Sequence, residues 1–305
     1  MTTDPRNVPG ATTDRTPGVL HHQASARPLA VVTGASSGIG LELARELVAR
    51  GFDVVATAED DVAAATRDLA PPRDLARPRD LAEAGAWVQP VQADLRTTAG
   101  LRALEEAVLA VGRPVEVLAL NAGVGNSGAF VDTPLEKDLD VVAVNVTALV
   151  HLAKRLVPPM AERGRGRVLV TSSVAALMPG PYYATYAASK AFALSFAEAL
   201  RHELRRTGVT VTALLPGPTA TDYFAGGPQT TTPMGRGPKD SPAKVARDAC
   251  DALFAGKDKV VVRSVKARTM ALLGSVLPLR ARTAVHALAA RPSRAGREAS
   301  RRHDR

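Results

Sequence analysis

The stretch 29-LAVVTGASSGIGLELARELVARG-51 decides the fold of this chain. Its apolar start, Leu29 to Val32, is typical of a short buried strand. A turn with three glycines follows, and apolar residues then recur at helical spacing up to Gly51, a residue type that commonly ends a helix. The stretch therefore predicts a strand, a tight turn and a helix in direct succession.

The same alternation continues along the chain. Further apolar strands are expected at 53–58, 86–92, 115–120, 167–173 and 209–217, and helical patterns at 97–112, about 135–163 and 185–208. Strands that alternate with helices imply a parallel sheet covered on both faces. We therefore predict an α/β fold with a doubly wound (Rossmann) parallel sheet of about seven strands in three α/β/α layers.

The chain divides into one expected domain, residues 28–290, and two tails. Residues 1–27 are rich in Thr, Pro, Gly and charge, residues 291–305 are strongly basic, and both are expected to be disordered. Within 67–84 the letters RDLA occur three times, with prolines that forbid a continuous helix. We interpret this insertion as an extended surface loop, with a docking loop as the alternative. Residues 217–240, rich in Gly, Pro and Thr, are expected to form a lid over a site.

Composition indicates a soluble protein of a reducing compartment. The 305 residues are 46% hydrophobic, which is enough for a full core, and the single cysteine, Cys250, excludes a disulfide framework. The first residues lack the basic-then-apolar layout of a signal peptide. We therefore expect a cytoplasmic location.

The net charge of +9 is concentrated at one end. Residues 256–305 hold thirteen Lys and Arg against three Asp and Glu, so we interpret the basic end as a solvated tail and expect no nucleic-acid partner. Contact of this end with an anionic membrane surface is the alternative. The apolar stretch 270–290 fits core packing or a subunit contact, and a membrane-surface helix is the less favoured reading.

The glycine turn has the chemistry of a phosphate cradle. Gly34, Gly38 and Gly40 have the spacing G-x-x-x-G-x-G, which permits a tight turn and a close approach of backbone N–H groups to a pyrophosphate. The N-terminus of the following helix favours negative charge. A nucleotide site is therefore predicted after the first strand.

A second motif, 182-YYATYAASK-190, pairs a phenol with an ammonium group. On a helix, positions i and i+4 lie on one face, and Tyr186 and Lys190 have that spacing. Tyr182 and Tyr183 precede the expected helix start. Because a phenol has a pKa of about 10, a nearby cation that stabilises the phenolate would make Tyr186 a usable proton donor and acceptor near neutral pH.

These motifs together resemble the short-chain dehydrogenase/reductase family over roughly residues 29–263. The resemblance rests on TGASSGIG, ADL around Asp94, LNAG at 120–123, YAASK and PGPTAT after the sixth strand. It implies that the dinucleotide contacts Gly34, Ser36, Ser37, Gly38, Ile39, Gly40, Glu59, Asp94, Leu95, Asn121, Ala122, Gly123, Tyr186, Lys190, Pro216, Gly217, Thr219 and Thr221.

The resemblance also implies a catalytic tetrad. The family's serine lies thirteen residues before its tyrosine, which leads to Ser173, and its asparagine corresponds to Asn145. Ser173 would polarise the substrate oxygen, Tyr186 would exchange the proton, and Lys190 would lower the pKa of Tyr186 and hold the nicotinamide ribose. Asn145 would support the proton relay; taken alone, it fits a satisfied core amide.

The choice between NAD and NADP depends on the end of the second strand. Ala58 occupies the position of the Asp found in NAD-preferring members, and Glu59 occupies that of the Arg found in NADP-preferring ones. Ser37, another place for a basic residue, is neutral. An acidic run without a nearby cation favours NAD. The alternative is that Glu59 points into solvent and the site discriminates little.

Substrate contacts are expected from the lid and from the loop before the tyrosine helix. The apolar candidates are Tyr223, Phe224 and Met234 in the lid, with Leu177, Met178 and Tyr183 on the opposite wall.

The resemblance implies an NAD(P)-dependent oxidoreductase that interconverts a secondary alcohol and a ketone by direct hydride transfer. It also implies a homodimer or homotetramer, and no metal site is predicted. The alternative is a non-catalytic dinucleotide-binding scaffold or sensor.

Overall fold

Seven parallel strands form the central sheet of the computed structural model, which describes residues 27–69, 85–220 and 239–261 with the single positions Thr283 and Ala287. The strands are β1 (Leu29–Thr33), β2 (Asp53–Ala58), β3 (Val88–Gln92), β4 (Val115–Leu120), β5 (Gly166–Thr171), β6 (Val209–Leu215) and β7 (Lys259–Val261). Their order in the sheet is β3-β2-β1-β4-β5-β6-β7. The order reverses between β1 and β4, which is where open α/β sheets bind ligands. The predicted Rossmann fold is confirmed.

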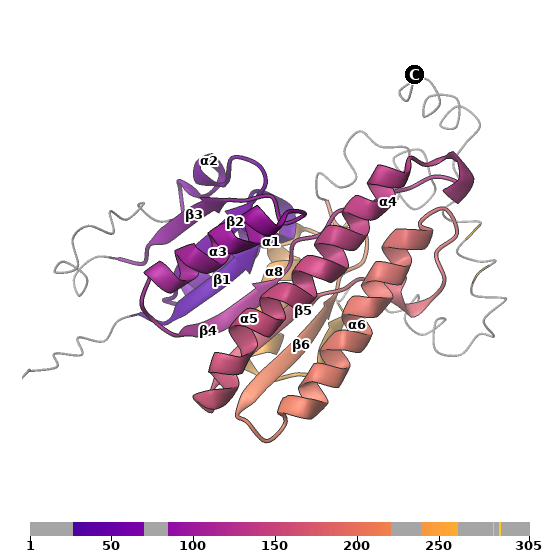
Figure 1. The fold of residues 1–305 in the computed structure, drawn as a ribbon. Coiled ribbons are helices and arrows are strands. Elements are labelled where there is room, and N and C mark those ends of the chain that lie inside the picture. The colour runs from indigo at the N-terminus through magenta and orange to yellow at the C-terminus, as the bar shows by residue number, and fades with distance from the viewer. Residues whose placement is uncertain (1–26, 70–84, 221–238, 262–282, 284–286, 288–305) are drawn as a thin grey trace, which may run out of the picture.

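Helices cover both faces of this sheet (Figure 1). On one face α1 (Gly38–Ala49), α2 (Val62–Thr66) and α8 (Pro242–Phe254) pack over a core cluster that includes Leu43, Leu47 and Leu253. On the other face α3 (Thr98–Ala110), α5 (Leu149–Glu162) and α6 (Ala184–Leu204) pack over a cluster that includes Leu104 and Leu152. The sheet is thus the middle of three layers.

Strand β1 shows how the sequence pattern builds both cores. Leu29 and Val31 belong to one cluster, whereas Ala30 and Val32 belong to the other, because successive side chains of a strand point to opposite faces. An apolar run without polar interruption is therefore needed, as predicted for a strand buried on both sides. Pro90 sits in β3, the edge strand, where a missing N–H donor is tolerated.

The long helical stretch expected at about 135–163 is three joined segments. Helix α4 (Leu135–Val142) runs into a π-helical segment, η3 (Ala143–Ala148), and then into α5. Among the described residues, the whole run Leu135–Glu162 is the one helix that is long and apolar enough to cross a membrane. Leu149, Leu152 and Met160 are buried against the sheet, so we describe it as a core helix.

A buried ion pair lies at the end of the sheet where β2 begins. Asp53, the first residue of β2, is 3% exposed, and its carboxylate accepts a hydrogen bond from Arg113 Nη2 at 2.7 Å. Its other oxygen accepts from the backbone N–H of Trp87 at 3.2 Å. Two short 3₁₀ segments, η2 (Phe130–Asp132) and η4 (Val174–Leu177), complete the described elements.

Several predicted segments lie outside the described residues. These are the two tails, most of the RDLA insertion (70–84), most of the expected lid (221–238) and most of the stretch 270–290. Leu69, at the start of the insertion, packs against the core cluster on the α1 face.

Candidate active site

A cavity of about 330 Å³ lies at the carboxyl edge of the sheet, where β1, β2, β3, β4, β5 and β6 end. Its lining contains every predicted catalytic or cofactor-contact residue in the described parts of the chain except Asn145. Thr221 lies outside the described residues. The predicted residues that line it are Gly34, Ser36, Ser37, Gly38, Ile39, Gly40, Glu59, Asp94, Leu95, Asn121, Ala122, Gly123, Ser173, Tyr186, Lys190, Pro216, Gly217 and Thr219.

The glycine turn between β1 and α1 forms one wall of the cavity. Gly34 and Gly38 have φ values of 69° and 55°, in the left-handed region that glycine adopts readily. A Cβ at position 40 would lie 1.8 Å from the carbonyl oxygen of Gly34 and 2.6 Å from Asn121 Nδ2. The turn therefore closes this tightly only because position 40 has no side chain.

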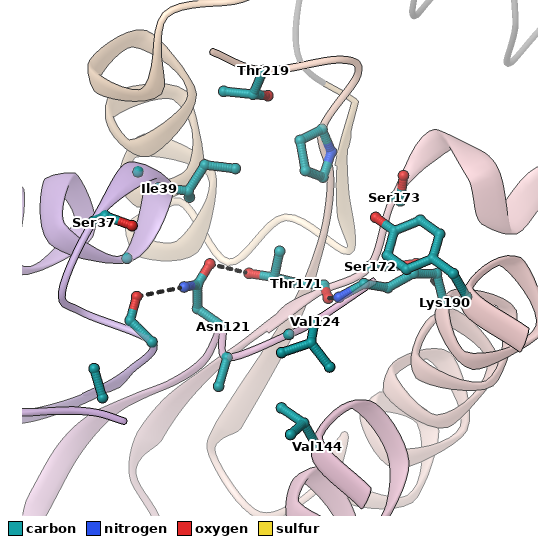
Figure 2. A pocket seen from close by; sticks show the side chains of 18 of the residues that line it. Ser37, Ile39, Asn121, Val124, Val144, Thr171, Ser172, Ser173, Lys190 and Thr219 are labelled. Atoms are coloured by element: carbon teal, nitrogen blue, oxygen red, sulfur yellow. Dashed lines mark hydrogen bonds between the residues drawn. The ribbon is translucent and has the colours of Figure 1, made fainter. Parts of the chain in front are cut away.

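The N-terminus of α1 opens onto this wall (Figure 2). Ser37 is the N-cap, and its side chain makes no capping hydrogen bond to the helix. The first N–H groups of a helix have no partner within it and carry part of the positive end of the helix dipole. Backbone without side chains at Gly38 and Gly40 leaves these donors accessible, so the wall fits the pyrophosphate of a dinucleotide.

Asn121, at the end of β4, holds the floor of the cavity together. Its Nδ2 donates to the carbonyl oxygen of Thr33 at 3.1 Å, and its Oδ1 accepts from Thr171 Oγ1 at 3.1 Å. Figure 2 shows Asn121, Thr171 and Lys190 following one another across this floor. The side chain therefore ties the ends of β1, β4 and β5 into a fixed surface.

Tyr186 and Lys190 occupy the opposite wall, one turn apart on α6 as predicted. Lys190 Nζ lies 5.9 Å from the centre of the Tyr186 ring and donates to the carbonyl oxygen of Thr171 at 3.1 Å. The ammonium group is buried, with the whole residue 5% exposed. Tyr183 is the N-cap of α6, as expected for a residue before the helix start, and it also lines the cavity.

Of the strand-end hydroxyls, Ser173 is the one that meets the phenol. Its side chain hydrogen-bonds with the Tyr186 hydroxyl, and its Oγ also accepts from the backbone N–H of Ala175 at 3.1 Å. Ser172, by contrast, donates its hydroxyl proton to the carbonyl oxygen of Lys190 at 2.7 Å, inside the protein. The count of thirteen residues thus selected the serine that is in contact with Tyr186.

Burial, and not the lysine, dominates the ionisation of the pair. Desolvation raises the pKa of Tyr186, the hydrogen bond with Ser173 partly lowers it again, and the charge interaction with Tyr183 raises it. Desolvation lowers the pKa of Lys190 to about 8. The net shift of the Tyr186 pKa is therefore upward, opposite in direction to the lowering expected from Lys190.

Asn145 stands behind the cavity wall, in the π segment. Its Oδ1 accepts from the N–H of Val124 and its Nδ2 donates to the carbonyl oxygen of Val124, both at 2.9 Å. The same Nδ2 donates to Ser189 Oγ, which donates to the carbonyl oxygen of Tyr186. A Cβ on Gly123 would lie 2.9 Å from Lys190 Nζ and 3.3 Å from Asn145 Oδ1. Asn145 and Lys190 thus approach each other across a glycine.

At the end of the cavity next to β2 and β3 lies a residue that the sequence analysis did not predict, Arg96. Glu59 and Asp94 line the cavity, and Arg96 forms ion pairs with both of them. The expectation that no cation lies near the acidic run is therefore wrong. The sequence could have indicated this cation, because Arg96 follows Asp94 by two residues and the strand before it, β3, is the neighbour of β2 in the sheet.

The expected substrate wall is found in part. Tyr183 lines the cavity, but Leu177 and Met178 are not in the lining that the described residues form. Met178 is buried, and Leu177 packs against the core. The lid candidates Tyr223, Phe224 and Met234 lie outside the described residues.

Comparison with known proteins supports the resemblance to the short-chain dehydrogenase family. Residues 28–230 match the family model described as short chain dehydrogenase. An uncharacterized oxidoreductase of Myxococcus xanthus is 37% identical over 192 residues, which are 62% of this chain and 70% of the relative.

Two solved structures share the fold at recognisable sequence identity. A short-chain dehydrogenase from Sphingobium yanoikuyae in complex with NADPH is 30% identical with a TM-score of 0.66, covering 81% of this chain and 93% of that one. A 3-ketoacyl-(acyl-carrier-protein) reductase from Brucella melitensis complexed with NADH is 26% identical with a TM-score of 0.61, covering 76% and 96%. The chain therefore belongs to the short-chain dehydrogenase family of oxidoreductases.

Proposed function

We propose that this protein interconverts a secondary alcohol and a ketone with a nicotinamide dinucleotide as the redox partner. The observation that supports the proposal is the meeting of Ser173, Tyr186 and Lys190 at one cavity whose other wall is the glycine turn. The chemistry that a bound nicotinamide would supply is the hydride, transferred to the carbonyl carbon or taken from the alcohol carbon. The residues of the chain then have to transfer one proton and stabilise the charge that develops on the substrate oxygen.

Tyr186 exchanges that proton with the substrate oxygen. In the reducing direction its phenol donates the proton, and the proton is then replaced from solvent. Burial raises the pKa of the phenol, so Tyr186 is protonated at neutral pH and suited to be the donor. Ser173, already hydrogen-bonded with this phenol, donates to the same oxygen and stabilises its developing negative charge.

Lys190 supplies positive charge next to the phenol. Its Nζ is fixed by the carbonyl oxygen of Thr171, and this leaves two further N–H donors on the ammonium group. We propose that these donors hold the nicotinamide ribose. Asn145 positions the tyrosine helix through Ser189 and keeps the Gly123–Val124 backbone next to Lys190.

The acidic residues at the adenosine end favour NAD over NADP in this proposal. Glu59 and Asp60 both line the cavity there, and a carboxylate accepts from a ribose 2′-hydroxyl but repels a 2′-phosphate. Among the similar structures, one contains NADPH and another NADH.

We propose a ketone with an apolar or mixed chain as the substrate. Val124, Val144 and Tyr183 line the cavity beside the catalytic pair. The similar reductase from Brucella melitensis is named for a ketoacyl group, which is a ketone of this kind. Short-chain dehydrogenases often form oligomers, and we propose a homodimer or homotetramer.

The test is a panel of ketones and secondary alcohols assayed with each cofactor, following the absorbance of the reduced nicotinamide. Tyr186→Phe should lower turnover by roughly 10²- to 10⁴-fold while the dissociation constant for the dinucleotide changes little. Tyr182→Phe is the matched control, because Tyr182 is not in the described lining of the cavity. Dinucleotide binding without turnover on any compound would favour the non-catalytic scaffold, and wild-type turnover by Tyr186→Phe would refute the proton-transfer role.

A further inference from the structure

Arg96 is the centre of a charge network at the adenosine end of the cavity. Its Nε donates to Asp94 Oδ1 at 2.9 Å, its Nη2 is paired with Glu59 Oε1, and its Nη1 lies 3.4 Å from Asp140 Oδ2. Glu59 follows β2, Asp94 follows β3, and Asp140 belongs to α4. One guanidinium group therefore contacts carboxylates from three separate parts of the fold.

Two of the three carboxylate partners of Arg96 line the cavity. Glu59 and Asp94 both line the cavity, at strand ends where the adenosine ribose and base are expected. This assignment of the adenosine end rests on the proposed function. Two of the three ion pairs of Arg96 are thus made with residues expected at the adenosine, and one of these, Glu59, is the residue expected to select the cofactor.

The ion pair engages the charged groups that Arg96 and Glu59 could otherwise present to a ligand. Arg96 is partly exposed, with 30% of its side chain accessible, and its Nη2 is engaged by Glu59, which lines the cavity. A guanidinium group binds phosphate in the same two-pronged geometry as it binds carboxylate. Glu59 therefore occupies a donor group of Arg96 that a 2′-phosphate would also use.

We propose that Arg96 is a masked 2′-phosphate site, and that its ion pair with Glu59 determines which cofactor is selected. With the pair closed, the carboxylate of Glu59 is held at the cavity edge, where it accepts from a ribose 2′-hydroxyl. With Glu59 replaced by a neutral residue, the freed Nη2 of Arg96 binds a 2′-phosphate. Arg96 is a positioning residue in the first state and a ligand-binding residue in the second.

The merely structural reading makes a different prediction. If Arg96 only joins β3 to α4 through Asp140, removing the charge of Glu59 should act through the general field of the site, and Arg96 should not be required. The two readings differ in whether the effect of Glu59 depends on Arg96, which a double-mutant cycle measures.

The experiment measures ligand binding by isothermal titration calorimetry, without turnover. The probes are adenosine 5′-monophosphate and adenosine 2′,5′-bisphosphate, which differ by the 2′-phosphate alone. The proteins are the wild type, Glu59→Gln, Arg96→Gln, the double variant, and Glu106→Gln. The last variant removes the same charge from an exposed position of α3 and serves as the matched control.

Glu59→Gln should bind the bisphosphate about tenfold more tightly than the wild type, relative to the monophosphate, because a charge-assisted bond to Arg96 is gained. The gain should be absent from the double variant and from Glu106→Gln. It should also shrink as salt is raised. Thermal unfolding of each variant shows whether it is folded.

Two results would overturn the inference. One is an equal gain in Glu59→Gln and in the double variant, which would assign the effect to lost negative charge alone. The other is no gain in Glu59→Gln while the monophosphate still binds. If neither probe binds any folded variant, the adenosine site itself is misplaced and the proposed cofactor binding fails together with the inference.

Discussion

Replacing Lys190 by methionine should stabilise the protein at pH 7 although it removes a residue of the active site. Burial lowers the pKa of Lys190 from its ordinary value of 10.5 to about 8 in the folded protein. The group is 5% exposed, so little solvent screening applies to it. The gap between the two pKa values corresponds to about 3 kcal/mol, by which the fold disfavours the ammonium form relative to the neutral amine.

The sign of the pH dependence follows from proton binding. Below about pH 8 the folded and unfolded chains both carry the proton on Lys190, and the full penalty is present. Between about 8 and 10.5 the unfolded chain binds more protons, so the stability of the wild type rises with pH and the penalty is lost. Methionine has no proton to bind, so the variant lacks this rise.

Methionine also loses the hydrogen bond from Nζ to the carbonyl oxygen of Thr171, which leaves a buried acceptor at a cost of about 1 kcal/mol. The expected net stabilisation at pH 7 is therefore about 2 kcal/mol. For a protein of this size that corresponds to an increase in Tm of roughly 4–8 °C.

Scanning calorimetry of both proteins without dinucleotide, at pH 7 and at pH 10, measures this. The advantage of Lys190→Met should be largest at pH 7 and should be lost or reversed at pH 10. Lys154→Met, at an exposed position of α5, is the control and should show no such pH dependence. A variant that is less stable at pH 7, or an advantage that is equal at both pH values, would refute the reasoning.

Two further substitutions test the packing around the site and the ion pair between Arg113 and Asp53. Gly123→Ala places a Cβ 2.9 Å from Lys190 Nζ, so turnover should fall at least tenfold, and the pKa of the ammonium, followed by its NMR chemical shift, should change; unchanged values of both would contradict the crowding. Arg113→Leu leaves the carboxylate of Asp53 buried without its cation, so urea unfolding should show a loss of about 3 kcal/mol. Asp53→Asn combined with Arg113→Leu should recover part of it, and a single variant as stable as the wild type would show that the pair contributes nothing.

The sequence predicted the parts of the site that local chain geometry determines. The glycine turn, the strand before it and the spacing of Tyr186 and Lys190 are each contained within one short segment, and the structure places them as expected. These features depend on dihedral preferences and on helical periodicity, which neighbouring residues specify. Ser173 was found in another way, from the family resemblance, by counting thirteen residues back from Tyr186.

What the sequence did not predict depends on contacts between distant segments. The run 135–163 fits one helical pattern, and the π segment at 143–148 contains no glycine or proline that would mark it. Within it, Asn145 is bonded to Val124 and Ser189, which are 21 and 44 residues away. Likewise Glu59 and Arg96 are 37 residues apart, and they meet because β2 and β3 are neighbours in the sheet.

The two ends of the cavity use positive charge in opposite ways. Lys190 is buried, and its ammonium group donates to a neutral acceptor, the carbonyl oxygen of Thr171. Burial lowers its pKa to about 8, so its charge can be lost near that pH. Arg96 is partly exposed and surrounded by three carboxylates, which raise its pKa further and keep it charged at any working pH. Proton-linked effects should therefore come from the Lys190 end. Salt should act mainly on the Arg96 end, because exposed charges are screened far more than buried ones. Varying pH at fixed salt, and then salt at fixed pH, therefore separates the effects of Lys190, where we propose that the reaction takes place, from those of Arg96, where we propose that the cofactor is selected.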